Sequence, residues 1–385
     1  MKIPLVDLAA QHAEVADEVN QGLAEVFAAT AFIGGQAVNQ FERAYADFLG
    51  VSHCVGVANG TDGLELALRA VGVQPRGEVI MPANTFIATA EAASRIGAVP
   101  VLVDVDPDYL LIDPSKVAAA ITRRTQAIVP VHLFGQTAFV EQLRSLAIEA
   151  GVPIVEDAAQ AQGARRYDRS AGSLGLAAAT SFYPGKNLGA AGDAGAVTTD
   201  DPEVAARVRL LGSHGSPTKY VHQIVGVNSR LDTVQAVVLR AKLARLAKWN
   251  ELRREAAARY GELLADVPGV RVPISAPDNE DVWHLYVVRV PERDRVLARM
   301  NEAGVGAGIH YPTPVHLTPA YAHLGFRAGS FPIAEQAALG ILSLPLYPHL
   351  TFEQQEYVAD SLAAAARQIN GGQRYRADLA SVVGE

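Results

Sequence analysis

Cysteine is almost missing from this sequence, because Cys54 is the only one among 385 residues. A single thiol cannot form an internal disulfide, which fits a reducing compartment. Long apolar runs are missing too, since no window of about 18 residues is free enough of charge and polarity to span a bilayer. The opening "MKIPLVDLAAQHAEVADEV" places acids and a histidine where a secretory signal needs an apolar stretch. We therefore expect a cytoplasmic protein without membrane contact.

Positive charge is also in short supply. The chain has 33 Lys and Arg residues against 41 Asp and Glu residues, a net charge of −8. Phosphate backbones are bound by clustered positive charge, so this balance argues against a nucleic-acid partner and leaves room only for a local basic pocket. Apolar residues make up 49% of the chain, which is enough for a large core. The length favours two domains.

Short β-rich runs alternate with helical patterns through the first two thirds of the chain. This rhythm predicts an α/β fold whose parallel sheet is flanked by helices. Residues 233–266 predict one long helix that bridges two domains, at 1–250 and 251–385, the second a smaller α+β unit. The end of the chain, "GGQRYRADLASVVGE", predicts a loosely attached tail. The predicted strands are "CVGVANG", "EVIMP", "VPVLVDV", "QAIVPVHLFG", "VPIVEDA" and "AATSFYP", with "VWHLYVVRV" and "ILSLPLY" in the second domain.

The stretch "VANGTDGLELALRAVG" reads as a strand, a glycine-containing turn and a helix. Glycines such as Gly60 let the backbone approach a ligand, and the free N–H groups of a first helical turn attract an anion. This pattern favours a phosphate site. The alternative is an ordinary helix cap provided by Thr61 or Asp62.

An acid ends a buried strand in "VPIVEDAAQAQGA". Asp157 falls at the carboxyl end of this strand, the edge at which open α/β sheets bind ligands, and its carboxylate can hold a cationic ring nitrogen. Strand alternation points the adjacent Glu156 to the opposite face. The alternative for Asp157 is a cap or turn residue.

A single lysine lies among small, turn-forming residues in "SFYPGKNLGAAGDAGAVTT". Lys186 comes 29 residues after Asp157, in the loop that follows Ser181. Lysine forms Schiff bases with carbonyl compounds, and burial lowers its pKa toward the useful range. The alternative is a lysine on a surface loop. A phosphate cradle, a carboxylate and a Schiff-base lysine are together the parts of a pyridoxal phosphate site.

The chain resembles the DegT/DnrJ/EryC1/StrS sugar aminotransferases over nearly its whole length. The motifs that carry the resemblance include "GTDGLELALRAVGV", "VIMPANTFIATAEA", "VEDAAQAQGA", "SFYPGKNLGA" and "GVNSRLDTVQAVVL". The resemblance implies the type I aminotransferase fold, with a large domain that binds pyridoxal phosphate and a smaller C-terminal domain. It also implies that pyridoxamine phosphate forms between two half-reactions. A histidine in place of Lys186 would mark the family's dehydratases.

The resemblance also assigns roles to individual residues. Lys186 would form the Schiff base with the cofactor and then move the substrate's proton, while Asp157 would pair with the ring nitrogen. Gln160 would lie near the phenolic oxygen, and Phe86 would stack on the ring. The phosphate would be held by Gly60, Thr61 and Ser181, with Asp62 in the same turn and Asn228 reaching in from the partner subunit of a homodimer.

The substrate is implied by a later segment, "HGSPTKYVHQIVGVNSRLD". It resembles enzymes that aminate dTDP-linked keto deoxysugars, with C3 favoured and C4 possible, and with L-glutamate as the amino donor. Lys219, Tyr220 and His222 are candidates for holding the sugar or diphosphate, with a structural loop as the alternative. Two other functions stay open: an aminocyclitol aminotransferase and a non-catalytic regulatory protein.

Three histidines follow in "IHYPTPVHLTPAYAHLG". His310, His316 and His323 are spaced by six and seven residues without accompanying cysteines or ligand-like carboxylates, so we expect no metal site. By resemblance, His310 and Tyr311 border the entrance for the substrate.

Overall fold

A mixed β-sheet forms the centre of the molecule, which is described here by a computed structural model covering the backbone of residues 1–382 and the side chains of residues 1–368. A four-stranded set has the order β1-β9-β8-β5, and a three-stranded set has the order β3-β2-β4. Parallel bridges from Ile128 to Ile154 and from Val131 to Asp157 join the two sets into one sheet. The strands are β1 (His53–Val57), β2 (Glu78–Pro82), β3 (Val99–Val103), β4 (Thr125–Ile128), β5 (Val155–Asp157), β8 (Ala177–Ser181) and β9 (Gly195–Thr199).

All six strands predicted in the large domain are present, but the sheet is not parallel throughout. Strand β9 was not predicted, and it runs antiparallel to both β8 and β1. The connection from β8 to β9, residues 182–194, contains Lys186 and no helix, and is called the lysine loop below. Because a parallel crossover usually runs through a helix, a connection without one favours the antiparallel return of the chain.

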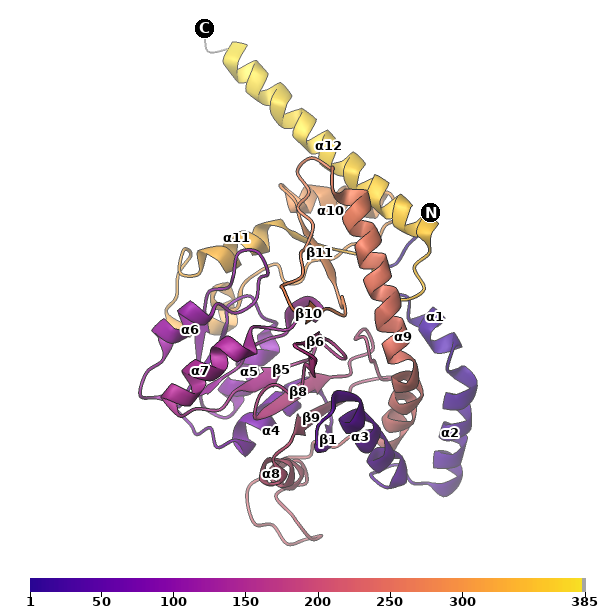
Figure 1. The fold of residues 1–385 in the computed structure, drawn as a ribbon, viewed down its shortest axis with the longest axis vertical. Helices are drawn as coiled ribbons and strands as arrows, with labels where there is room; N and C mark the ends of the chain where they lie inside the picture. The colour runs from indigo at the N-terminus through magenta and orange to yellow at the C-terminus, as the bar shows by residue number, and fades with distance from the viewer. Residues whose placement is uncertain (383–385) are drawn as a thin grey trace.

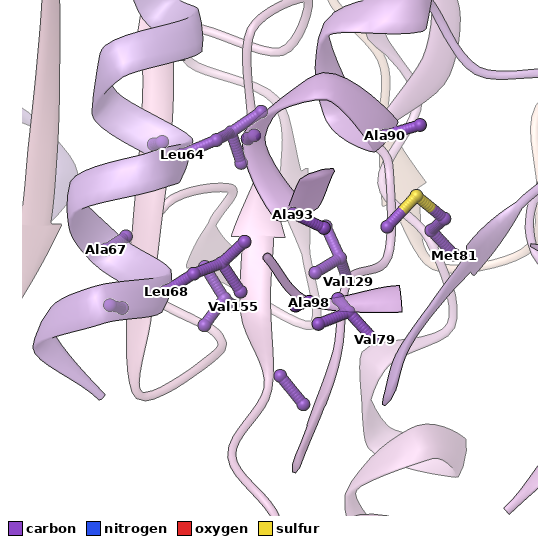
Figure 2. Packing of buried hydrophobic residues seen from close by; sticks show 14 of the residues in the cluster. Leu64, Ala67, Leu68, Val79, Met81, Ala90, Ala93, Ala98, Val129 and Val155 are labelled. Atoms are coloured by element: carbon purple, nitrogen blue, oxygen red, sulfur yellow. The ribbon is translucent and has the colours of Figure 1, made fainter. Parts of the chain in front are cut away.

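Helices cover both faces of this sheet (Figure 1). On one face, α4 (Gly60–Ala70) and α5 (Ile87–Arg95) pack side by side, and α8 (Pro202–Gly212) packs on α4. Figure 2 shows Leu64 and Leu68 of α4 near Val155 of the sheet. Each fully buried leucine stabilises the fold by about 1.5–3 kcal/mol relative to an exposed one. A second cluster joins the sheet to α6 (Pro114–Ala120) and α7 (Val140–Ala150).

The long helix predicted at 233–266 is confirmed as α9 (Thr233–Leu264). It packs against α3 (Gln36–Leu49) and α2 (Ala16–Ala29), and the short α1 (Leu8–Ala13) precedes them. Because neither glycine nor proline occurs before Gly261, the helix continues without a break.

The C-terminal part has a hydrophobic cluster of its own. The two runs predicted as strands here form β11 (Tyr286–Arg289) and β12 (Ile341–Leu344), and the structure pairs them antiparallel. Tyr260 and Leu264 of α9 belong to this cluster, and so does Ile3 from the start of the chain. The domain boundary near residue 250 stays a prediction. The remaining elements are α10 (Arg293–Glu302), α11 (Pro332–Gly340), α12 (Phe352–Val382), the two-residue strands β6 (Arg165–Arg166), β7 (Arg169–Ser170) and β10 (Asn279–Glu280), and the 3-10 helices η1 (Leu133–Gly135), η2 (Val315–Leu317) and η3 (Pro319–Leu324).

The segment predicted as a tail is not a separate unit in its backbone. Helix α12 continues through Gly371 and Gly372 to Val382 and projects beyond the body of the molecule (Figure 1). The predicted tail therefore begins inside this helix, and its last three residues lie outside the described residues. Within residues 1–382, none of the helices is both long and apolar enough to cross a membrane.

Candidate active site

A cavity of about 500 Å³ opens at the carboxyl ends of the central strands. Its wall is assembled from the turn after β1, the turn after β2, the end of β5, the lysine loop and two segments of the C-terminal part. This is the edge at which ligand sites of open α/β sheets lie. Nine of the predicted site residues line it: Gly60, Thr61, Phe86, Asp157, Gln160, Ser181, Lys186, His310 and Tyr311.

Asp157 ends strand β5 and is buried at the floor of the cavity. Its Oδ2 accepts a hydrogen bond from the Thr89 hydroxyl at 2.7 Å, and its Oδ1 accepts one from the Ala159 amide at 3.2 Å. Thr89 belongs to α5, and its hydroxyl also contacts that of Thr85 at 2.7 Å. These contacts fix the carboxylate before a ligand binds. The sequence predicted Asp157 but gave no indication of Thr89.

Glu156 points away from the cavity, as strand alternation predicted. Its carboxylate contacts His132 Nε2 at 2.7 Å and accepts hydrogen bonds from three backbone amides, those of Gly172, Leu174 and Gly175. Both side chains of this pair are fully buried. Glu156 therefore ties His132 and the segment from Gly172 to Gly175 to strand β5, and it does not line the cavity.

Lys186 lies in a tight turn of the lysine loop, where its amide donates to the Tyr183 carbonyl at 2.8 Å. Burial lowers the pKa of its amine to about 8, and the Asp157 carboxylate opposes this shift. A lysine of this kind holds a substantial neutral fraction near pH 8. A neutral amine is the form that attacks a carbonyl carbon.

The turn after β1, for which a phosphate site was predicted, lies in the wall of the cavity. Helix α4 begins at Gly60, so the amides of Gly60 and Thr61 lie in its first turn. A Cβ added to Gly60 would lie 2.6 Å from the Cβ of Ser181, which shows how closely this turn approaches the end of β8. The helix cap is neither Thr61 nor Asp62 but Asn59, whose Oδ1 accepts from the Asp62 amide at 2.8 Å.

Asp62 does not line the cavity. Its carboxylate instead accepts a hydrogen bond from Arg95 at 3.0 Å. Arg95 also contacts Glu65 at 2.9 Å, so Asp62 belongs to an ion-pair group that ties α4 to α5. If Asp62 contributes to a phosphate site, it therefore does so through its backbone and not through its carboxylate.

An amide and two aromatic rings form the side wall. Gln160 accepts from the Phe134 amide at 2.6 Å, and its Nε2 donates to the Tyr311 hydroxyl at 3.0 Å. The Phe86 ring lies 5.1 Å from that of Tyr311 and is half exposed at the cavity. Burial and the Asp157 charge raise the pKa of Tyr311, so its hydroxyl stays protonated.

Four predicted residues lie elsewhere. Lys219, Tyr220, His222 and Asn228 are exposed on the loop between α8 and α9, which extends past α8 at the lower edge of Figure 1. None of them lines the cavity of the same chain. The Lys219 amine lies 5.1 Å from the centre of the Tyr220 ring, and His222 Nδ1 contacts the His214 carbonyl at 2.9 Å.

The three histidines that follow residue 309 have separate partners. His310 Nδ1 contacts the Ser343 hydroxyl at 2.8 Å, His316 pairs with Glu335 at 2.9 Å, and His323 contacts the Ala320 carbonyl at 3.1 Å. In the part of the chain that the structure describes, no group of three or more His, Cys, Asp or Glu residues is arranged to hold a metal ion.

Other residues of the cavity wall carried no separate assignment in the sequence. Asn59, Thr85, Tyr183, Asp193 and His284 belong to this group. His284 sits about 100 residues beyond the lysine loop in sequence, just before β11, inside a run that predicted only a strand. Fold-level contacts bring it to the site, and these leave no local pattern in the sequence.

The cavity fits pyridoxal phosphate. The cradle beside Gly60 and Ser181 provides first-turn amides for a phosphate, the fixed Asp157 carboxylate suits a protonated ring nitrogen, and Lys186 has an amine of lowered pKa. Phe86 offers an apolar ring face beside them.

Comparison with known proteins gives the same assignment. Residues 13–363 match the model of the DegT/DnrJ/EryC1/StrS aminotransferase family. The erythromycin biosynthesis sensory transduction protein EryC1 of Saccharopolyspora erythraea is 48% identical over 95% of this chain and 100% of its own length. The dTDP-3-amino-3,4,6-trideoxy-alpha-D-glucose transaminase of Streptomyces venezuelae is 45% identical over 96% of this chain and 97% of its own. The crystal structure of S. venezuelae DesV in complex with a ketimine intermediate superimposes with a TM-score of 0.93, at 46% identity, over 95% of this chain and 98% of that one. The chain therefore belongs to the DegT/DnrJ/EryC1/StrS aminotransferase family and is an aminotransferase that depends on pyridoxal phosphate.

Proposed function

We propose that this aminotransferase moves an amino group from L-glutamate to a keto carbon of a dTDP-linked deoxysugar, with C3 favoured over C4, in the biosynthesis of an amino sugar. The observation that carries the proposal is the cavity itself, in which Lys186, Asp157 and Phe86 lie together around about 500 Å³ of open space. The sugar is supported by the transaminase of S. venezuelae, whose name specifies a dTDP-3-amino sugar and which aligns with 96% of this chain.

The residues of the cavity divide the work. When bound, pyridoxal phosphate supplies an electron sink for the electrons left at the substrate's Cα. Asp157 would keep the proton on the ring nitrogen, because its carboxylate is fixed by Thr89 and Ala159 and lies at the buried floor of the cavity. Lys186 would anchor the cofactor, and its amine, once freed, would take the Cα proton of the donor and deliver it to the cofactor carbon.

The remaining wall orients the ligands. Gly60, Thr61 and Ser181, which line the cavity, would hold the phosphate. Gln160 would lie near the phenolic oxygen, and Phe86 would pack on the ring. His310 and Tyr311 border the opening through which donor and acceptor enter in turn. Burial and the Lys186 charge lower the pKa of His310 to about 4, so this ring is neutral at physiological pH and adds no charge at the opening.

The loop between α8 and α9 serves the site of a partner subunit in this proposal. Lys219, Tyr220, His222 and Asn228 do not line the cavity of their own chain, and their side chains are exposed. In a homodimer, Asn228 would reach the partner's cofactor phosphate, and Lys219 and His222 would meet the negative diphosphate of the sugar nucleotide.

Mixed dimers test the shared site. Neither Lys186→Ala nor Asn228→Ala homodimers should be active, because each lacks one half of every site. Mixed dimers should regain one intact site and a fraction of wild-type activity. Subunit exchange is verified with two affinity tags. If confirmed exchange restores nothing, or if the protein is a monomer in solution, the shared arrangement is wrong.

Product analysis tests the substrate. Purified enzyme is incubated with glutamate and matched 3-keto and 4-keto dTDP sugars, and the products are identified by NMR. We expect amination of the 3-keto compound. Turnover of the 4-keto compound alone would refute C3, and turnover of neither sugar together with activity on an inosose would refute the nucleotide sugar in favour of an aminocyclitol. Failure with all acceptors, despite a complete half-reaction with glutamate, would leave the donor correct and the acceptor wrong.

A further inference from the structure

A chain of buried amides runs from the interior of the protein to His284. The Asn250 Nδ2 group donates to the backbone carbonyl of Gln162 at 2.9 Å, and the Asn187 Nδ2 group donates to Asn250 Oδ1 at 2.9 Å. Asn187 Nδ2 also donates to the backbone carbonyl of Val282 at 2.9 Å. Asn187 Oδ1 then faces His284 Nδ1 at 3.2 Å.

The two backbone carbonyls give this chain a single direction. A carbonyl oxygen only accepts, so each asparagine must turn its NH₂ group toward the carbonyl it meets. Reversing Asn187 would place its oxygen against the carbonyl of Val282, and reversing Asn250 would place its oxygen against that of Gln162. Both asparagines are almost fully buried, so water cannot relieve such a contact. The orientation of both amides is therefore determined by the backbone.

The direction of the chain sets the protonation of His284. Because Asn187 presents an oxygen, His284 Nδ1 must carry a hydrogen to donate. The ring as a whole stays neutral, since burial and the nearby charges of Lys186 and Arg253 hold the pKa of His284 well below the usual range. A neutral imidazole with a hydrogen on Nδ1 has a bare Nε2.

The bare nitrogen has no partner among the side chains and backbone groups that the structure describes. Nε2 makes no hydrogen bond to any of the residues that the structure describes, and the ring lines the same cavity as Lys186. The backbone at His284 packs closely against Gly135. A Cβ at position 135 would lie 2.7 Å from the His284 amide nitrogen, so a larger residue there would displace His284.

We propose that His284 is locked as the Nδ1–H tautomer by the Asn187–Asn250 amide chain and presents Nε2 to the cavity as an obligate hydrogen-bond acceptor. Its ligand is an N–H or O–H donor next to the reacting atoms. Two groups offer this chemistry: the freed amine of Lys186 and a hydroxyl of the acceptor sugar. The hydroxyl source rests on the proposed function, whereas the locked tautomer does not.

The tautomer is measured directly. Enzyme labelled with ¹⁵N-histidine and saturated with pyridoxamine phosphate is studied by imidazole NMR at pH 6–9, and the signals of His284 are assigned by their loss in His284→Gln. We expect a hydrogen bound to Nδ1 and an unprotonated Nε2 across this range. A hydrogen on Nε2, or a doubly protonated ring at pH 7, would overturn the proposal whatever the substrate is.

The donor is found by comparing His284→Phe, which has no acceptor, with His284→Gln, whose amide oxygen can replace Nε2. If Lys186 is the donor, NMR titration of its amine in the form saturated with pyridoxamine phosphate should show a lower pKa in the phenylalanine variant. If the sugar is the donor, KM for the acceptor should rise about tenfold in that variant while the half-reaction with glutamate is unchanged. Glutamine should restore the affected quantity in either case. An acceptor role is refuted if the Lys186 pKa and the KM for the acceptor equal those of the wild type in both variants. If the phenylalanine variant does not fold, the wild type and the glutamine variant decide. A hydrogen on Nε2 in the wild type would then refute the role, and so would a Lys186 pKa and an acceptor KM in the glutamine variant that both differ from those of the wild type.

Discussion

Two neighbouring carboxylates on strand β5 show how one strand can serve two purposes. Asp157 faces the cavity, with one hydroxyl and one amide as its partners, while Glu156 faces the interior and receives three amides and a histidine. The residues differ by one position and by the face of the sheet. The partially satisfied carboxylate is left with capacity to bind a ligand, and the fully satisfied one can only hold the fold together.

Removing Lys186 should give the largest change. Lys186→Ala should lower overall transamination on the order of 10⁴-fold, since the variant has neither an anchor nor a group to move the proton. The free energy of unfolding, measured by urea titration, should be nearly unchanged, because a lysine at the wall of a cavity contributes little to packing.

A second buried lysine provides the control for this assignment. Lys242 is buried on α9, where its amine donates to the Gly189 carbonyl at 2.7 Å and burial lowers its pKa. Borohydride reduction followed by peptide mapping should place the cofactor on Lys186. A reduced adduct on Lys242 in place of Lys186 would overturn the assignment of Lys186 as the lysine that binds the cofactor.

Replacing Asp157 should separate activity from stability. Asp157→Asn keeps the size of the side chain but removes the negative charge that would hold the proton on the ring nitrogen in the proposed mechanism. The half-reaction with glutamate, the proposed donor, should then slow by about 10²- to 10³-fold. Stopped-flow absorbance measures this rate, and calorimetry should find the midpoint of unfolding within a few degrees of the wild type. A near-normal rate would mean that the carboxylate has a different task.

Replacing Glu156 should produce the opposite pattern. Glu156→Gln puts an NH₂ group where backbone amides now donate, which should reduce the free energy of unfolding by about 3 kcal/mol. The fraction that remains folded should keep a rate close to that of the wild type. Denaturant titration and the rate per bound cofactor together test this, and a loss of rate without a loss of stability would contradict the division between the two faces.

A third buried carboxylate sharpens the comparison with the smallest expected effect. Asp281 has one oxygen bonded to the Ser275 hydroxyl and the other without a partner, and burial raises its pKa from 3.8 to about 6. The folded state then binds more protons than the unfolded state between these values, so this contribution is fully present below pH 3.8 and is lost as pH rises to 6. It amounts to at most about 3 kcal/mol.

Asp281→Asn should remove that dependence on pH. The variant's stability, measured by urea titration from pH 4 to 7 and expressed relative to the wild type, should improve as pH rises toward 6. A constant difference between the two proteins over this range would show that Asp281 has the same pKa in both states.

Much of the large domain could be predicted, because its information is local. Apolar runs located β2 and β5, and the short turn with Asn59 and Gly60 located the start of α4. Strand β9 was missed because its residues, "GAVTT", follow a glycine-rich loop and only the pairing with β8 and β1 on both sides identifies them.

The site divides in the same way. The position of Lys186 and Asp157 at the cavity could be predicted because each has a distinctive chemical type in a distinctive local setting. Thr89, His284 and Asn250 could not, since their importance comes from a partner far away in the sequence: Asp157, Asn187 and Gln162, respectively. The prediction for Asp62 identified the correct turn, but the ion pair with Arg95 depends on how α4 and α5 pack.

Helix α9 couples the unfolding of two hydrophobic clusters, because it belongs to both. Leu239, Leu243 and Leu246 belong to a cluster with α3, whereas Tyr260 and Leu264 belong to the cluster of the C-terminal part. Unfolding of either cluster would remove the apolar contacts of one half of α9 while the other half stayed packed. The exposed half would then lose the tertiary contacts that stabilise its hydrogen-bonded turns. Amide hydrogens along α9 should thus exchange as one cooperative unit, so that heat or denaturant cannot release the C-terminal part while leaving the cavity intact.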